Sequence, residues 1–74
     1  MEIDVFVERF IEAVDFPEPV PIDADTVFSQ LEFWDSLSQL GVIVLFDLEF
    51  GKTITADDIA TCVTVRDLHA VALN

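Results

Sequence analysis

The sequence predicts a small all-α domain of four helices, three main ones and one short one, over residues 1–74. Apolar residues recur at spacings of three and four near both ends of the chain, which is the period of a helix. The stretch 36–50 contains no proline, is too long for an ordinary strand, and is followed by a glycine. Two Thr-x-x-Asp segments, beginning at Thr55 and Thr64, have the pattern of a helix capping box.

The first helix is predicted over residues 2–14. Its apolar residues form one stripe, while most of the charged residues lie off that stripe. Acidic residues near its start suit the positive end of the helix dipole. We expect Val5 and Ile11 to lie beside the stripe and to widen it. The stripe consists of Ile3, Phe6, Val7, Phe10 and Val14.

An extended connector is expected at 15–22, where three prolines alternate with other residues. Each proline ring removes a backbone donor and disfavours helical backbone at the preceding residue, so no helix is expected there. We interpret the stretch as a stiff loop rather than as a proline-rich docking motif. After it, Asp25 or Thr26 is expected to begin a short turn that places three apolar residues in the core. These are Val27, Phe28 and Leu31.

The segment that begins at Asp23 starts like a calcium-binding loop, but it does not continue as one. Such a loop needs an oxygen ligand at its fifth position, glycine at its sixth and glutamate at its twelfth. Val27, Phe28 and Trp34 occupy these positions. We therefore expect no metal site.

The second helix is predicted over residues 36–50. Asp35 or Ser36 is a suitable N-cap, Ser36 and Gln39 fit the Ser-x-x-Gln capping box, and Gly51 is a suitable C-cap. The free backbone N–H groups and the dipole at a helix start favour an anion. A phosphate ester on the Ser36 hydroxyl would therefore be well placed.

The second helix is apolar on every side from Leu40 to Phe46, and three neighbours in so small a domain are unable to cover it fully. Its best core stripe is formed by Val42, Phe46 and Phe50, with Ile43 and Leu45 beside it. A second apolar face, close to Ser36, is expected to stay exposed and to serve as a docking surface. Its residues are Leu37, Leu40 and Val44.

The last third of the chain contains a short helix after Thr55 and a closing helix from about Thr64 to Leu73. Ile59 and Cys62 are expected to face inward from the short helix. The closing helix has an apolar stripe, and His69 lies off it, so we expect this histidine at the surface. The stripe consists of Val65, Leu68, Val71 and Ala72.

The composition excludes several classes of function. Fifteen acidic residues and three basic ones give the chain a net charge of −12. This charge disfavours binding to nucleic acids and to anionic membranes. It favours a monomer and partners that have basic patches. We expect a cytoplasmic protein for three reasons. The single cysteine is typical of a reducing compartment, the acidic start differs from a secretory signal, and no apolar run is long enough to span a membrane. One histidine and no glycine-rich loop leave no catalytic constellation, so we expect no enzyme.

The centre of the chain resembles the acyl carrier protein family, which includes the peptidyl and aryl carrier domains. The resemblance rests on Asp35-Ser36-Leu37 at the start of the second helix, on Trp34 before it, and on the ending Glu49-Phe50-Gly51. It implies a four-helix bundle whose serine, here Ser36, carries 4′-phosphopantetheine. In the family a phosphopantetheinyl transferase attaches this arm from coenzyme A, and the arm holds acyl or aminoacyl groups as thioesters.

The resemblance also implies roles for the residues around the serine. Asp35 and Leu37 are expected to lie at the cofactor and the transferase. Leu40, Gly41 and Val44 are expected to belong to the surface that acyl-loading and acyl-processing enzymes contact. Gly41 lowers the stability of a helix by roughly 1 kcal/mol relative to alanine, and we expect it to permit close approach of a partner or of the arm.

The second helix departs from the common fatty-acid carriers, which have acids in its first turns, because it has no acid between Asp35 and Asp47. We therefore expect a specialised lipid or secondary-metabolite pathway. The alternative function is an unmodified acidic helical interaction module, in which Ser36 only caps a helix. The sequence leaves open the cargo. It also leaves open whether acid stabilises the fold by relieving repulsion or destabilises it by protonating the caps.

Overall fold

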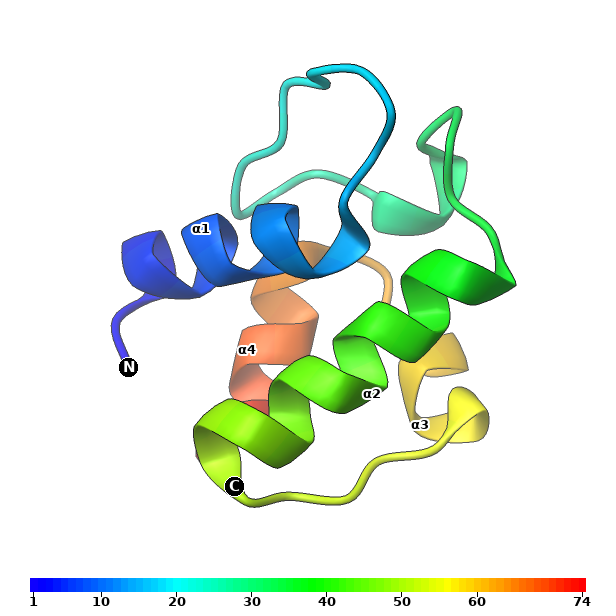
Figure 1. Cartoon of the computed structure of the whole chain (residues 1–74). Coiled ribbons are helices and arrows are strands. Elements are labelled where there is room, and N and C mark those ends of the chain that lie inside the picture. Colours follow the sequence, from blue (N-terminus) through cyan, green and yellow to red (C-terminus); the bar gives the residue numbers. More distant parts are fainter.

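Four α-helices and one 3-10 turn follow one another along the chain in the computed structural model, which describes residues 1–74 (Figure 1). The fold is all-α, as the sequence predicts. The predicted bounds of the second helix are confirmed at both ends. The elements are α1 (Ile3–Val14), η1 (Phe28–Gln30), α2 (Ser36–Phe50), α3 (Ala56–Ala60) and α4 (Val65–Leu73).

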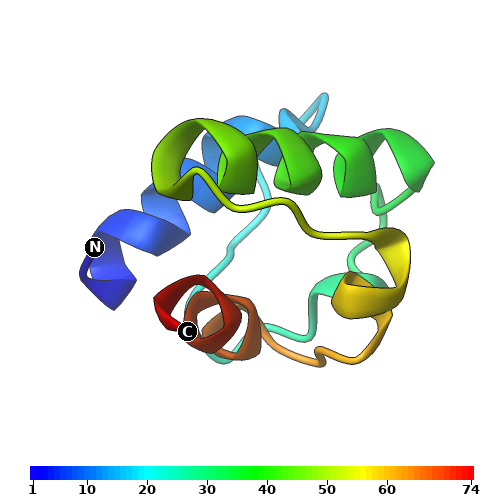
Figure 2. The same ribbon diagram turned by 90° about the horizontal axis from the view of Figure 1, so that it is seen from below.

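The helices form two layers with phenylalanine side chains between them. Seen from below, α1 and α2 lie on one side and α3 and α4 on the other (Figure 2). The Phe6 ring contacts those of Phe46 and Phe50, with centroids 6.1 and 6.0 Å apart. Phe6, Phe10, Phe28 and Phe46 are fully buried, and Phe50 is half-buried. Such large apolar side chains supply much of the hydrophobic stabilisation available to a chain of this length.

Both capping boxes are confirmed. The Thr55 hydroxyl accepts the Asp58 N–H at 3.2 Å, and the Asp58 carboxylate accepts the Thr55 N–H at 2.9 Å. In the second box the Thr64 hydroxyl accepts the Asp67 N–H at 3.2 Å, and the Asp67 carboxylate accepts the Thr64 N–H at 3.0 Å. Gly51 ends α2 in the left-handed conformation with φ 58°, the conformation that glycine adopts without a steric penalty.

Three expectations for individual side chains are wrong or only partly met. Val5 and Ile11 do not widen the core stripe, because α1 turns them outward and they are exposed. His69 is half-buried rather than on the open surface. Its ring centroid lies 5.3 Å from that of Phe6 and its Nε2 lies 2.7 Å from the Met1 carbonyl oxygen, because α4 packs this side against the start of the chain. Cys62 is half-buried and Ile59 is buried.

The loop between α1 and α2 is attached to the start of α4. The predicted turn is present as η1, and it buries Phe28, whereas Val27 and Leu31 are only half-buried. Just before it, the Thr26 hydroxyl accepts the Asp23 N–H at 2.8 Å. The N–H groups of Val65 and Arg66, which have no partner within the first turn of a helix, donate to carbonyl groups of the loop at 3.2 and 2.8 Å. This attachment sets the path of the chain toward the beginning of α2.

Candidate cofactor attachment site

The start of α2 is capped by Asp35. Its backbone is extended, with φ −150° and ψ −172°, and its carboxylate accepts the Ser38 N–H at 2.9 Å. The Asp35 alternative is therefore confirmed. The Ser36–Gln39 capping box is wrong, because Ser36 is already the first helical residue and the Gln39 N–H donates to the Asp35 carbonyl at 3.1 Å.

Ser38 is a contributor to the site that the sequence reasoning missed. Its side chain is buried, and its hydroxyl lies 3.1 Å from the Asp35 carboxylate and 3.3 Å from the Phe33 carbonyl oxygen. It therefore holds both the cap and the turn that precedes the helix. The signal in the sequence was the spacing of three residues between Asp35 and Ser38, which is the spacing between an N-cap and the N–H it accepts.

Ser36 is exposed, and the hydrogen bonds that cap the helix are made by its neighbours Asp35 and Ser38. Its hydroxyl is thus not needed to begin the helix. It lies at the positive end of a fifteen-residue helix whose first turn contains no acidic residue. A phosphate group esterified to this oxygen would meet free backbone N–H groups and a favourable dipole, so the position fits a phosphate-linked group.

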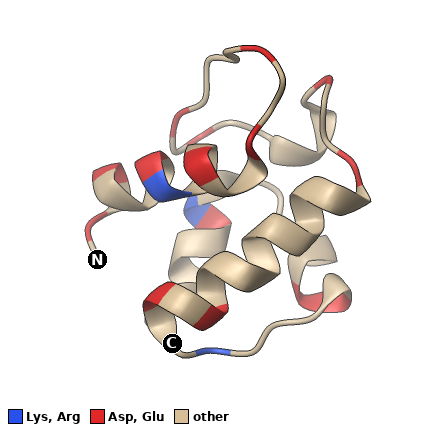
Figure 3. Cartoon of the chain, in the orientation of Figure 1, with Lys and Arg blue, Asp and Glu red and all other residues tan.

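The predicted exposed apolar face of α2 is confirmed as a feature of the structure. Leu37, Leu40 and Val44 are 74%, 53% and 46% exposed. Leu48 extends the face by another turn. Figure 3 shows α2 without charged residues from its first residue to its last turn, whereas acidic residues surround it on α1 and on the loops. The face begins one residue after Ser36.

Gly41 is explained by the packing of α2 against α1. A Cβ atom at this position would lie 2.2 Å from the Ala13 carbonyl oxygen, a distance that real side chains do not tolerate. The close approach that the glycine permits is therefore to α1 of the same chain. The expected place of Gly41 in a surface for partners stays a prediction.

A groove of about 660 Å³ lies between the exposed face of α2 and the end of α1. The predicted residues Asp35, Leu37, Leu40, Gly41 and Val44 all line it, so the structure brings them together next to Ser36. The opposite wall comes from α1 and the loop after it, which the sequence reasoning did not connect with the site. That wall includes Arg9, Glu12, Asp15 and Phe16.

The chain matches the family model described as the phosphopantetheine attachment site over residues 4–71. It belongs to this family. Members are acyl and peptidyl carrier proteins, which bear covalent 4′-phosphopantetheine and interact with transferases and biosynthetic enzymes. No curated protein and no solved structure gave a match.

In this carrier domain, hydrogen bonds hold the pKa values of two capping carboxylates below their ordinary value of 3.8. The Ser38 N–H is the main cause for Asp35, and the Thr64 N–H, followed by that of Val63, is the main cause for Asp67. A lowered pKa in the folded state means that the ionised carboxylates stabilise the fold above their unfolded-state pKa. This stabilisation disappears as the pH falls through the folded-state values.

We expect the double variant Asp35→Asn, Asp67→Asn to have a lower melting temperature than the wild-type carrier domain at neutral pH. Asparagine is also a good N-cap, but it lacks the negative charge, so the variant loses the charge-assisted part of the hydrogen bonds that Asp35 and Asp67 accept. The difference in melting temperature should shrink as the pH falls below the unfolded-state pKa of about 3.9 and then through the lower folded-state values, because both wild-type carboxylates become protonated. Thermal unfolding followed by circular dichroism measures this. A difference that is independent of pH would contradict the assignment of these two caps.

No helix of the carrier domain combines the length and the apolar character needed to cross a membrane.

Proposed function

We propose that Ser36 is the attachment residue for 4′-phosphopantetheine in this carrier domain. A phosphopantetheinyl transferase would join the Ser36 oxygen to the phosphorus of the arm and break the pyrophosphate bond of coenzyme A. Adenosine 3′,5′-bisphosphate is the leaving group, and the hydroxyl proton passes to a base of the transferase. The observation that carries the proposal is the exposed Ser36 hydroxyl at the first position of α2, beside a cap that Asp35 and Ser38 complete without it.

The attached arm supplies a thiol that holds acyl or aminoacyl groups as thioesters. The protein contributes position and surface. The capped start of α2 fixes Ser36, and Leu37, Leu40 and Val44 offer apolar contacts beside it. These residues, with Gly41 at the floor of the face, form the proposed surface for loading and processing enzymes.

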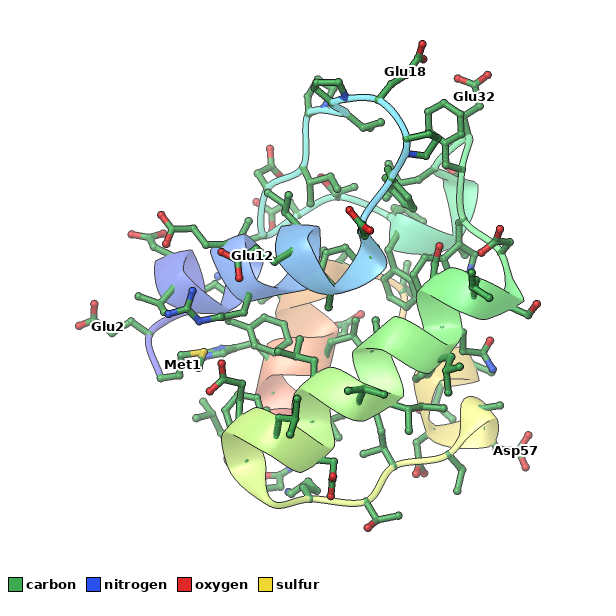
Figure 4. All side chains as sticks on the ribbon, in the orientation of Figure 1. Met1, Glu2, Glu12, Glu18, Glu32 and Asp57 are labelled. Atoms are coloured by element: carbon green, nitrogen blue, oxygen red, sulfur yellow. The ribbon has the colours of Figure 1, made fainter.

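Charge favours partners with basic patches. The carboxylates of Glu2, Glu18, Glu32 and Asp57 point away from the helices in Figure 4. With a net charge of −12, such a surface attracts basic partners from a distance and keeps copies of the chain apart as monomers. Contact at α2 itself is apolar, since no acid lies between Asp35 and Asp47.

The apolar contact surface supports a specialised lipid or secondary-metabolite pathway over bulk fatty-acid synthesis. We also propose that the protein works in the cytoplasm and is not itself an enzyme. The unpaired Cys62 supports a reducing compartment.

Intact mass spectrometry after incubation with coenzyme A and a broad-specificity phosphopantetheinyl transferase tests the proposal. We expect a gain of one phosphopantetheine, on the peptide that contains Ser36. A known carrier domain treated in parallel controls for transferase activity. If the folded protein gained nothing while the control was modified, Ser36 would be only the first residue of a helix. The chain would then be an acidic interaction module.

A further inference from the structure

Ser38 is the only polar residue that is buried in this chain, with 3% of its surface exposed. Its backbone N–H and its hydroxyl lie 2.9 and 3.1 Å from the same carboxylate oxygen of Asp35, Oδ1. The Phe33 carbonyl oxygen is a second acceptor, 3.3 Å from the hydroxyl. A hydroxyl donates only one proton, and the charged, nearer carboxylate is the stronger acceptor. The hydroxyl therefore donates to Asp35, with the Phe33 carbonyl as the alternative.

The two bonds from Ser38 hold the Asp35 carboxylate by one oxygen only. The other oxygen, Oδ2, makes no hydrogen bond within the chain, and Asp35 is exposed. The bonds also lower the pKa of Asp35 from its ordinary value of 3.8, the backbone N–H more than the hydroxyl, so the carboxylate is ionised at neutral pH. A charged oxygen with a restricted orientation thus lies one residue before Ser36.

No lysine or arginine of the chain is free to pair with this carboxylate. Arg9 bridges two glutamates, Arg66 pairs with an aspartate of the loop, and Lys52 donates to backbone carbonyl groups at the end of α4. A partner for the free oxygen therefore has to come from another molecule. A cationic side chain of the transferase that modifies Ser36 has the charge this position requires.

We infer that Ser38 is a positioning residue for the modification of Ser36, because its hydroxyl holds the Asp35 carboxylate where a cationic group of the transferase binds it. The inference rests on the proposed attachment at Ser36. Since Ser38 is buried, it acts through Asp35 and not by contact with the transferase. The carboxylate is ordered before the transferase arrives, which lowers the entropy cost of association. Its contribution therefore belongs to binding, and so to KM rather than to kcat.

A double-mutant cycle on the rate of modification tests the inference. Ser38→Ala removes the hydroxyl but keeps the N–H that caps the helix, whereas Asp35→Asn removes the charge. With saturating coenzyme A, we expect Ser38→Ala to lower kcat/KM for the carrier domain by about tenfold, mainly through KM, because one hydrogen bond to a charged group is worth about that much. Asp35→Asn should lower it at least as far. The double variant should be no slower than Asp35→Asn alone.

A control variant and a titration separate positioning from stability. Thr55→Ala removes a capping hydroxyl at the start of α3, so it weakens the fold without changing the bonds to Asp35. Below its melting temperature it should be modified like the wild type. Carbon-13 NMR should give the wild-type Asp35 carboxylate a pKa below 3.8. Ser38→Ala should raise that pKa, and Thr55→Ala should leave it unchanged.

The outcomes distinguish this inference from the attachment on which it rests. If the wild type gained no phosphopantetheine while a known carrier domain did, both would be overturned. If the wild type were modified, a wild-type rate for Ser38→Ala, or additive losses in the double variant, would overturn the role of Ser38 alone. Equal slowing by Thr55→Ala would show a general effect of stability and would also overturn it. A wild-type Asp35 pKa of 3.8 or higher would do so without any variant.

Discussion

Replacing Ser36 by alanine is expected to abolish attachment of phosphopantetheine while the protein keeps its fold. The only oxygen placed to accept the arm is removed. The helix cap stays intact, because Asp35 and Ser38 form it. Ser36 is exposed, and alanine has a higher helix propensity than serine, so no loss of stability follows from the change. Intact mass after incubation with coenzyme A and transferase measures the loss, and thermal unfolding confirms the fold.

Ser29→Ala is the matched control, because Ser29 is also an exposed serine but lies in η1. This variant should be modified like the wild type. Modification of Ser36→Ala at another residue would contradict the assignment of the attachment site. Loss of modification in both variants would mean that the transferase recognises a surface that both substitutions disturb.

Replacing Gly41 by alanine is expected to destabilise the protein, although the same change in an ordinary helix interior stabilises it by about 1 kcal/mol. The added Cβ would meet the Ala13 carbonyl at 2.2 Å, so α1 and α2 must separate. Overpacking of this kind costs about 1–3 kcal/mol, and each kcal/mol lowers the melting temperature by roughly 4–8 °C in a domain of this size. Thermal and urea unfolding measure the change.

Gly51 provides the comparison that isolates packing. It has φ 58° and no atom within 4 Å of its Cβ position, so a substitution there meets backbone strain but no clash. At Gly41, substitution by leucine should lower the stability more than substitution by alanine. At Gly51, the alanine and leucine substitutions should lower the stability by similar amounts. A Gly41→Ala variant as stable as the wild type would mean that α1 shifts freely along α2.

The bounds of α2 were predictable because local chemistry sets both ends. A short acidic side chain is a good N-cap before the helix, and a glycine is a good C-cap after it, so few other start and end points are favourable. The stretch between them contains no proline. The exposed apolar face was predictable for a different reason. A helix that is apolar on every side has more apolar surface than three neighbours of this size are able to cover.

The choice between Asp35 and Ser36 as the cap was not predictable, since both are short polar residues that cap helices well. The backbone angles at Asp35 determine which residue is the cap, and these angles depend on the contacts of the Trp34 ring in the core. The Trp34 ring stacks on Phe10 with centroids 6.3 Å apart and meets Phe28 at 4.9 Å. Those contacts fix the chain immediately before Asp35.

The groove and the reason for Gly41 depend on the placement of α1. The atom that Gly41 accommodates is the backbone carbonyl oxygen of Ala13. Because every residue type has this atom, no side chain in the sequence indicates which residue contacts Gly41. The half-buried position of His69 has a similar cause. Its contact with Phe6 exists only once α4 and α1 are packed together.

The backbone bonds from α4 to the loop have a consequence for local opening. The Val65 and Arg66 amides are held by carbonyl groups of Thr26 and Ala24 rather than by their own helix. Their exchange with solvent deuterium therefore reports whether the loop is attached, while amides deeper in α4, such as that of Leu68, report whether the helix itself is folded. The two amides make the attachment of the loop that leads into α2 observable in the intact protein, with no label added near the serine.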